Sequence, residues 1–298
     1  MTAIVRVVGP EVLRQVKAIE LRTRRLVSTL FSGEYRSVFR GQGIEFAEVR
    51  AYEQGDDYRS IDWNVSARMG SPYVKTFVEE RELTLLLIVD RSGSVEFGQP
   101  RAKSDCAVEV AAVLALAAAR QNDRVGAVIF SEGVDHVVRP AKGRAHALRV
   151  LRDLVAFRPT RRGTNLAAAL AYGARLLRHR SVVVIISDFR ATDWEQPLRR
   201  LARRHEVVAI TVDDPRETEL PDAGWVELRD AESGRALLVD TSHARTRVKL
   251  QIAAEQTRLQ RARVFAQVQV DHVALRTDRP YTQALHRTFA LRARRLRR

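Results

Sequence analysis

The stretch LTLLLIVDRSGS, residues 83 to 94, decides the fold of this chain. Its first part, Leu83 to Val89, is a continuous apolar run, which is typical of a strand buried on both faces of a parallel sheet. An Asp-x-Ser-x-Ser run from Asp90 to Ser94 follows directly. Ligands of open parallel sheets bind beyond the carboxyl ends of the strands, so this pairing predicts an α/β fold with a polar site at that edge.

Strand and helix patterns alternate after this stretch. An alanine-rich helical segment covers 101–120, and two short strands are expected at 124–130 and 134–139. Further strands are expected at 182–187, 206–212, 224–228, 236–239 and around 268–275, and helices at 144–155, 165–178, 194–204, 246–262 and from 281. This alternation predicts a doubly wound, mostly parallel sheet with helices on both faces.

The residues before the first buried strand have a different texture. Val12, Val16 and Ile19 have the spacing of an amphipathic helix in the first thirty residues. Residues 41–78 mix glycines, aromatics and charges, which indicates loops and short strands. We therefore predict a small N-terminal subdomain over 1–80, made of helix and short strands, and a large domain over 81–298.

The chain is strongly basic. Among 298 residues there are 51 Lys and Arg against 36 Asp and Glu, a formal net charge of +15. This charge fits a solvated surface, and it also fits nucleic acid, anionic lipid or an acidic protein as a partner. The arginine-rich tail from Arg292 to Arg298 keeps nucleic-acid binding open as the alternative function.

The cysteine content and the length of the apolar stretches help to predict the cellular location of the protein. Cys106 is the lone cysteine, so an internal disulfide and a multi-cysteine zinc site are excluded. Its place in an apolar helical run indicates a buried structural thiol. The sequence opens without a signal-peptide pattern, and its apolar runs are too short to cross a bilayer. We expect no membrane span and a cytoplasmic location.

Oxygen-bearing side chains follow three segments of the predicted sheet. Asp90, Ser92 and Ser94 come after the first buried strand, Thr164 lies in a Gly-Thr-Asn loop, and Asp188 follows the strand at 182–187. Mg²⁺ prefers an octahedral shell of oxygens, and two carboxylates with three hydroxyls would leave the ion an open position. The sequence predicts that these five residues bind Mg²⁺ or another divalent cation such as Mn²⁺. In the alternative, Asp90 and Asp188 cap the helices that follow them.

The sequence lacks the enzyme motifs that we considered. The glycines of a phosphate-binding loop are missing before Lys103, and Ser92 lacks the flanking glycines of a hydrolase nucleophile. The seven histidines are scattered and form no ligand-spaced pair. We expect a protein that is not an enzyme, with a metal-dependent hydrolase as the weaker third hypothesis.

Two family resemblances rest on these residues. Residues 83–240 resemble the von Willebrand factor A domain with its magnesium-dependent adhesion site, and the match places Asp90, Ser92, Ser94, Thr164 and Asp188 at the metal. Nearly the whole chain, roughly 10–290, resembles the bacterial family called domain of unknown function 58. The signature segments of that family are Gly41 to Phe46, Arg50 to Tyr52, Gly55 to Trp63, Ala67-Arg68, Val74-Lys75 and Glu79 to Arg81.

The resemblance implies a function as well as a fold. In the von Willebrand factor A family the serines and the threonine coordinate the ion directly, while one or both aspartates act through water. A partner protein then offers an acidic side chain to the ion. Relatives are often encoded beside MoxR-class AAA+ ATPases, which implies an adaptor that couples such an ATPase to a target. Within the signature, Asp56, Asp57 and Asp62 fit a tight turn and a local ion pair better than a second site.

Overall fold

The computed structural model describes residues 9–31, 45–78, 83–98, 101–160 and 163–296. The chain divides into two compact units, one formed by residues 39–83 and one by residues 1–38 together with 84–298. The larger unit contains the predicted von Willebrand factor A-type domain. Each unit is described by itself.

The described part of the larger unit has a six-stranded sheet in the order β10-β7-β6-β3-β4-β5. Its strands are β3 (Thr84–Asp90), β4 (Arg124–Phe130), β5 (Val134–Ala141), β6 (Val182–Ser187), β7 (Glu206–Asp213) and β10 (Asp271–Arg276). The neighbours pair in parallel, except that β5 runs antiparallel to β4 at the edge. The predicted doubly wound, mostly parallel sheet is confirmed.

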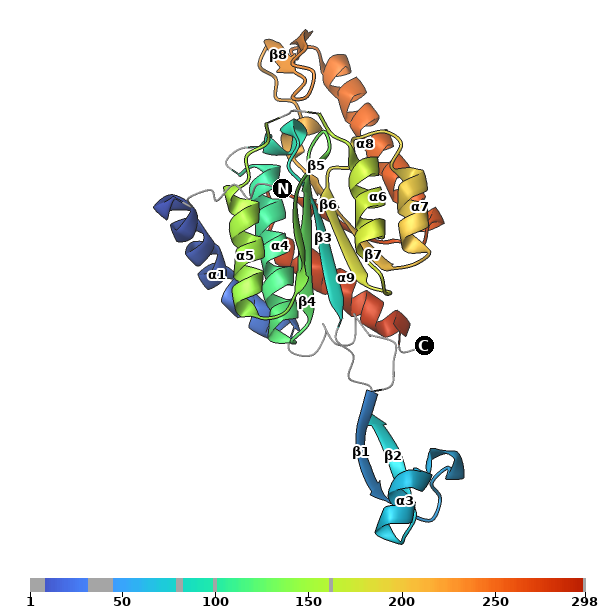
Figure 1. Ribbon diagram of the computed structural model, residues 1–298. Helices are drawn as coiled ribbons and strands as arrows, with labels where there is room; N and C mark the ends of the chain where they lie inside the picture. The colour runs from blue at the N-terminus through green and yellow to red at the C-terminus, as the bar shows by residue number, and fades with distance from the viewer. Residues whose placement is uncertain (1–8, 32–44, 79–82, 99–100, 161–162, 297–298) are drawn as a thin grey trace. The chain divides into compact units, whose positions relative to one another are not determined.

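Helices cover both faces of this sheet (Figure 1). Helices α4 (Lys103–Arg120) and α5 (Arg144–Ala156) lie on one face, and α6 (Leu166–Leu176), α7 (Glu195–Ala202) and α8 (Ala244–Gln267) on the other. Residues of β3, β4, β6 and β7 are buried almost throughout, as their continuous apolar runs predict. Apolar burial on both sides of the sheet supplies most of the driving force for this arrangement.

The N-terminal helix α1 (Pro10–Phe31) belongs to the larger unit, which differs from our grouping of it with the small subdomain. Val16 and Ile19 on its apolar stripe are buried, and the helix packs on α4 and α5. The ion pair between Arg22 and Glu109 of α4, 3.1 Å long, adds a polar contact. An amphipathic helix needs an apolar surface to cover, and α4 with α5 provides a larger one than two short strands would.

The remaining elements extend beyond the sheet. Two short 3₁₀ helices, η2 (Gly93–Glu96) and η3 (Pro215–Glu217), follow β3 and β7. Strands β8 (Trp225–Arg229) and β9 (Ala236–Asp240) form an antiparallel hairpin, and α9 (Tyr281–Leu296) packs on β10. Among the residues that the structure describes, no helix combines the length and apolar composition needed to cross a bilayer.

The small unit is built on an antiparallel pair, β1 (Glu45–Ala51) with β2 (Tyr73–Val78). Between them lie η1 (Tyr58–Ser60) and a short helix, α3 (Trp63–Met69), where we had expected only loops and strands. Asp56 pairs with Arg50 at 2.6 Å, and the carboxylate of Asp62 caps α3. These local roles agree with a structural signature. The signature residues 41–44 and 79–81 lie outside the described residues.

The lone cysteine is a core residue. Cys106 of α4 is fully buried, as predicted. Burial raises the pKa of its thiol to about 11 because the charged thiolate would lose its hydration. At neutral pH it therefore stays a protonated, unreactive side chain.

Gly126 tests the packing of the sheet edge. A Cβ added there would lie 2.8 Å from the ring carbons Cγ and Cδ and the backbone nitrogen of Pro140 in β5. We expect Gly126→Ala to lower the free energy of unfolding by about 1–3 kcal/mol, because the rigid proline ring and backbone must shift. Urea unfolding measures this. Gly133→Ala, in the β4–β5 turn with nothing within 4 Å of the added carbon, is the matched control, and an equal effect of both substitutions would contradict the prediction.

Candidate metal-binding site

The site lies where the sheet reverses its winding order. Strand β3 has β4 on one side and β6 on the other, in parallel register, with Val89 opposite Ile186 and Asp90 opposite Phe130. The chain leaves β3 into α4 on one face, whereas α6, which leads into β6, lies on the other face. Such a switch point opens a crevice at the carboxyl ends of the strands. Asp90 and Asp188 lie at this edge.

Asp90 is wholly buried and accepts hydrogen bonds from neutral donors. The backbone N–H of Ser92 donates to Oδ1 at 2.9 Å, and the hydroxyl of Ser187 donates to Oδ2 at 2.5 Å. Burial raises the pKa of this carboxyl to about 7, and the negative charge of Asp188 adds to the effect. A carboxylate so placed would gain from a nearby cation.

The two serines of the Asp-x-Ser-x-Ser run have a spacing suited to metal binding. Their hydroxyl oxygens, Oγ of Ser92 and Oγ of Ser94, lie 3.2 Å apart. Two adjacent corners of an octahedron with metal–oxygen bonds of about 2.1 Å are separated by about 3.0 Å. The pair could therefore supply two neighbouring ligand positions with little movement.

Thr164 lies in the loop before α6, at the end of the strand next to β3. The backbone N–H of Asn165 donates to the carbonyl of Ser131, just after β4, at 2.7 Å, and the Asn165 side chain caps α6. These bonds fix the loop at the carboxyl edge of the sheet. The hydroxyl of Thr164 donates to the carboxylate of Glu232, in the β8–β9 turn.

Asp188 follows β6 and is paired with a positively charged side chain of the protein, that of Lys103. The ammonium of Lys103 lies 2.9 Å from Asp188 Oδ2 and 2.7 Å from Glu217 Oε1, and its side chain is fully buried. Burial disfavours the charged form of Asp188, but the attraction of Lys103 outweighs it and lowers the pKa of this carboxyl. Likewise the two carboxylates outweigh burial and raise the pKa of Lys103. Asp188 and Lys103 are therefore both charged at neutral pH.

The backbone beside Asp188 is held by packing. Phe189 adopts a positive φ of 53°, a conformation that a bulky residue rarely takes. Its ring packs edge-on against Trp194 and Phe265, with centroids 5.2 Å and 4.9 Å away. The guanidinium of Arg261 donates to the carbonyl of Asp188. Packing of this kind sustains backbone strain at ligand sites.

The structure thus gathers the predicted residues at one edge of the sheet, with Asp90, Ser92 and Ser94 in one turn, Thr164 beside β4 and Asp188 after β6. The N-caps of η2, α4 and α7 are Ser92, Ala102 and Trp194, so neither aspartate is the N-cap residue of a following helix. Each aspartate does accept the backbone N–H of the residue two positions on, Asp90 from Ser92 and Asp188 from Arg190. Within the described residues no three histidine, cysteine or carboxylate side chains gather as a metal site. A metal here would depend on the hydroxyl oxygens.

Four residues of this edge were not predicted, namely Lys103, Ser187, Glu217 and Glu232. Lys103 left a weak signal, since a lysine in the first turn of a helix opposes the helix dipole. Ser187 precedes a predicted site residue directly. Glu217 and Glu232 lie in a segment whose pattern indicates only loose structure, so nothing local marks them.

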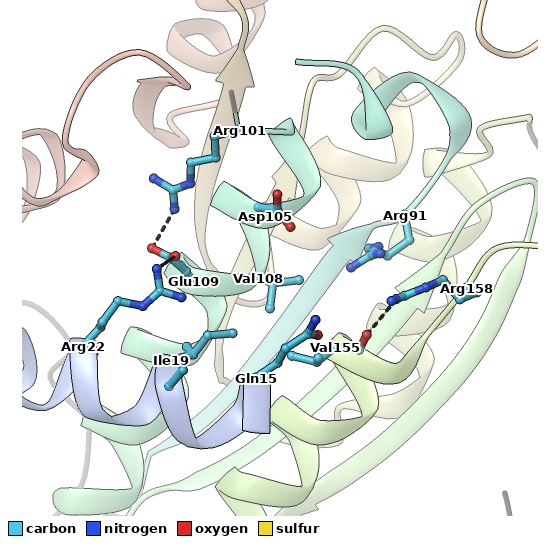
Figure 2. A pocket seen from close by; sticks show the side chains of 11 residues that line it. Gln15, Ile19, Arg22, Arg91, Arg101, Asp105, Val108, Glu109, Val155 and Arg158 are labelled. Carbon is cyan, nitrogen blue, oxygen red and sulfur yellow. Dashed lines mark hydrogen bonds and ion pairs between the residues drawn. The ribbon is translucent and has the colours of Figure 1, made fainter. Parts of the chain in front are cut away.

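A pocket rich in arginine includes Arg91 in its lining (Figure 2). It has a volume of about 390 Å³ between α1, α4 and the end of α5. Arg91, which directly follows Asp90, lines it together with Arg22, Arg101 and Arg158. Arg91 is almost fully buried, with its Nε unpartnered among the described residues, and donates to Glu96 at 3.1 Å. The four arginines of the lining stand against two acids, Asp105 and Glu109, and Glu109 pairs with both Arg22 and Arg101.

Comparisons with solved structures give remote similarities. The conserved hypothetical protein BatB from Bacteroides thetaiotaomicron is 15% identical with a TM-score of 0.46, over 71% of this chain and 99% of that chain. The SpRpn10 VWA domain is 10% identical with a TM-score of 0.40, over 69% and 94%.

Comparisons of sequence give a closer relationship. The family model "Protein of unknown function DUF58" matches residues 48–260. The uncharacterized protein Rv1480 of Mycobacterium tuberculosis is 36% identical over 291 residues, which are 96% of this chain and 91% of that protein. The uncharacterized protein Mb1516 of Mycobacterium bovis gives the same figures. The resemblance seen in the sequence is confirmed: this chain belongs to the DUF58 family and has a von Willebrand factor A-like fold.

Proposed function

We propose that this protein is a metal-dependent protein-interaction module and not an enzyme. Asp90, Ser92, Ser94, Thr164 and Asp188 would hold Mg²⁺ or Mn²⁺, and a partner protein would offer an acidic side chain. A von Willebrand factor A-like fold suits an interaction module. The observation that carries the proposal is the buried Asp90 carboxylate, which has neutral hydrogen-bond donors and lies beside a hydroxyl pair at octahedral spacing.

The charges around the two aspartates support a cation at Asp90. Lys103 forms ion pairs with Asp188 and Glu217. Asp90, in contrast, accepts hydrogen bonds from a serine N–H and a serine hydroxyl. Ionising a buried carboxyl without a cation is costly, which is why the pKa of Asp90 rises to about 7. A divalent ion would supply the missing charge, and with mainly neutral hydroxyl ligands it would keep its attraction for an incoming carboxylate.

The surroundings of the site favour an acidic partner. The buried Arg91, which follows Asp90 in the chain, lines a pocket together with three further arginines, and the whole chain carries a net charge of +15. Such a surface accelerates the encounter with an acidic protein. A MoxR-class AAA+ ATPase is the partner that we propose, with the module as its adaptor in assembly or remodelling of a target.

The alternative of nucleic-acid binding receives less support. Arg292, the first residue of the predicted basic tail, is buried and bonded to Asp271 and Glu206. Its charge is therefore engaged inside the fold. An enzyme is also less well supported, because the hydroxyl of Ser92 lies beside the Ser94 hydroxyl and the Asp90 carboxyl, which is not the serine–histidine pair that activates most serine nucleophiles.

The metal proposal is tested by removing two of the residues together. We expect Asp90→Ala with Ser92→Ala to abolish Mn²⁺ binding and the magnesium-dependent capture of a MoxR-class ATPase, because an anionic group and a hydroxyl ligand are lost. In the parent, Mn²⁺ at a hundredfold excess over its dissociation constant should raise the free energy of unfolding by about 2.7 kcal/mol. Calorimetry and thermal unfolding with and without chelator measure both effects.

A matched control exists elsewhere in the chain. Asp240 and Ser242 form the same local motif as Asp90 and Ser92, with the serine N–H 2.9 Å from the carboxylate. Asp240→Ala with Ser242→Ala should leave Mn²⁺ binding and capture unchanged. Equal capture by the parent in magnesium and in chelator would refute the proposal.

Lys103 yields a second prediction. Lys103→Met keeps the length of the side chain but leaves Asp188 and Glu217 without their shared cation. We expect the free energy of unfolding in chelator to fall by about 3–5 kcal/mol, the cost of breaking a buried ion pair. Excess Mg²⁺ should recover part of the loss, because the ion replaces the missing positive charge. Urea unfolding measures both, with the exposed Lys249→Met as control, and an equal loss in the two variants would contradict the expectation.

A further inference from the structure

A carboxylate of the protein itself reaches the candidate site. Glu232 accepts a hydrogen bond from the hydroxyl of Thr164, although 68 residues separate them. Thr164 is one of the five residues proposed to hold the ion. An acid bonded to such a residue lies directly beside the candidate site.

The turn that carries Glu232 is pre-organised. The carboxylate of Asp230 accepts from the backbone N–H groups of Glu232 and Ser233, at 3.0 Å and 2.6 Å, and from the hydroxyl of Ser233. Gly234 closes the turn with a φ of 71°. Glu232 is half-buried, whereas its neighbours Ala231 and Ser233 are exposed.

The hairpin that ends in this turn has little support from the core. It extends beyond the carboxyl ends of the parallel strands (Figure 1). Trp225, Leu237 and Leu238 on its strands are 67%, 65% and 61% exposed. At its base, Thr241 donates its backbone N–H to the carbonyl of Gly224 at 2.7 Å. A two-stranded hairpin is marginally stable alone, so the bond from Thr164 to Glu232 at its tip is well placed to hold it over the site.

We propose that Glu232 is an internal acidic ligand, which takes the open position of the metal site until a partner's carboxylate displaces it. The inference rests on the proposed function and deepens it. It assigns the hairpin as a built-in competitor, and it restricts partners to proteins whose acidic side chain outcompetes a carboxylate that is already tethered. A tethered acid has a high effective concentration, so a single weak external acid would be rejected.

Mn²⁺ binding to the full chain tests this. Free Mn²⁺ is measured by electron paramagnetic resonance, and the water coordinated to the bound ion by proton relaxation. For Glu232→Gln we expect the dissociation constant of Mn²⁺ to rise about tenfold, a change at the lower end of those seen when a residue supporting a metal is lost. The relaxation enhancement per bound ion should increase, because water fills the vacated position. A merely structural role would not add a coordinated water.

Glu227→Gln is the matched control, since it removes the same charge from an exposed carboxylate of the same hairpin. It should behave like the parent. Mn²⁺ binding in the parent with unchanged affinity and relaxation in Glu232→Gln would overturn the internal ligand while leaving the metal site intact. The same changes in both variants would also overturn it. Absence of Mn²⁺ binding in the parent and in Glu232→Gln would overturn the metal site itself and the internal ligand with it.

Discussion

Two buried carboxylates at the ends of adjacent parallel strands are the constraint on which this structure depends. Asp90 and Asp188 lie in a place where each raises the cost of ionising the other. The two carboxylates have different partners. Asp188 receives the ammonium of Lys103, whereas Asp90 receives only neutral donors and has a pKa near neutrality. This difference is the reason why we propose a cation at Asp90, whereas Asp188 is already paired with the ammonium of Lys103.

The fold brings this arrangement about through its connections. The chain passes from β3 through η2 into α4, whose first residue, Lys103, returns beneath the strand ends. Strand β7 leads into η3, where Asp214 and Glu217 form a capping box that fixes the Glu217 carboxylate. Arg261 of α8 bridges Asp213 and the Asp188 carbonyl. Groups from four distant segments therefore hold one buried charge cluster, in which the loss of Lys103 would leave Asp188 without its paired cation.

Features of the site that depend on local sequence could be predicted, whereas contacts between residues far apart in the chain could not. The apolar runs that precede Asp90 and Asp188 carry local patterns of burial, so the sheet and the place of these two residues at its carboxyl edge could be predicted from sequence. Lys103 and Glu232 act through contacts with residues 85 and 68 positions away, which no local pattern encodes. The grouping of α1 failed for the same reason, because its apolar stripe shows that it packs but not against which surface.

The two contacts at this edge differ in how firmly the rest of the fold holds them. Lys103 occupies Asp188 without reaching Asp90, and Glu232 contacts Thr164 from a hairpin with little core burial. A bound cation would lie close to the positive charge of Lys103, and it could be coordinated by the carboxylate of Glu232. Metal affinity and partner affinity are then coupled through one carboxylate, since an acid that strengthens the hold on the ion also closes the position that a partner needs. The module would therefore respond to the strength of its partner's acid as much as to the metal itself.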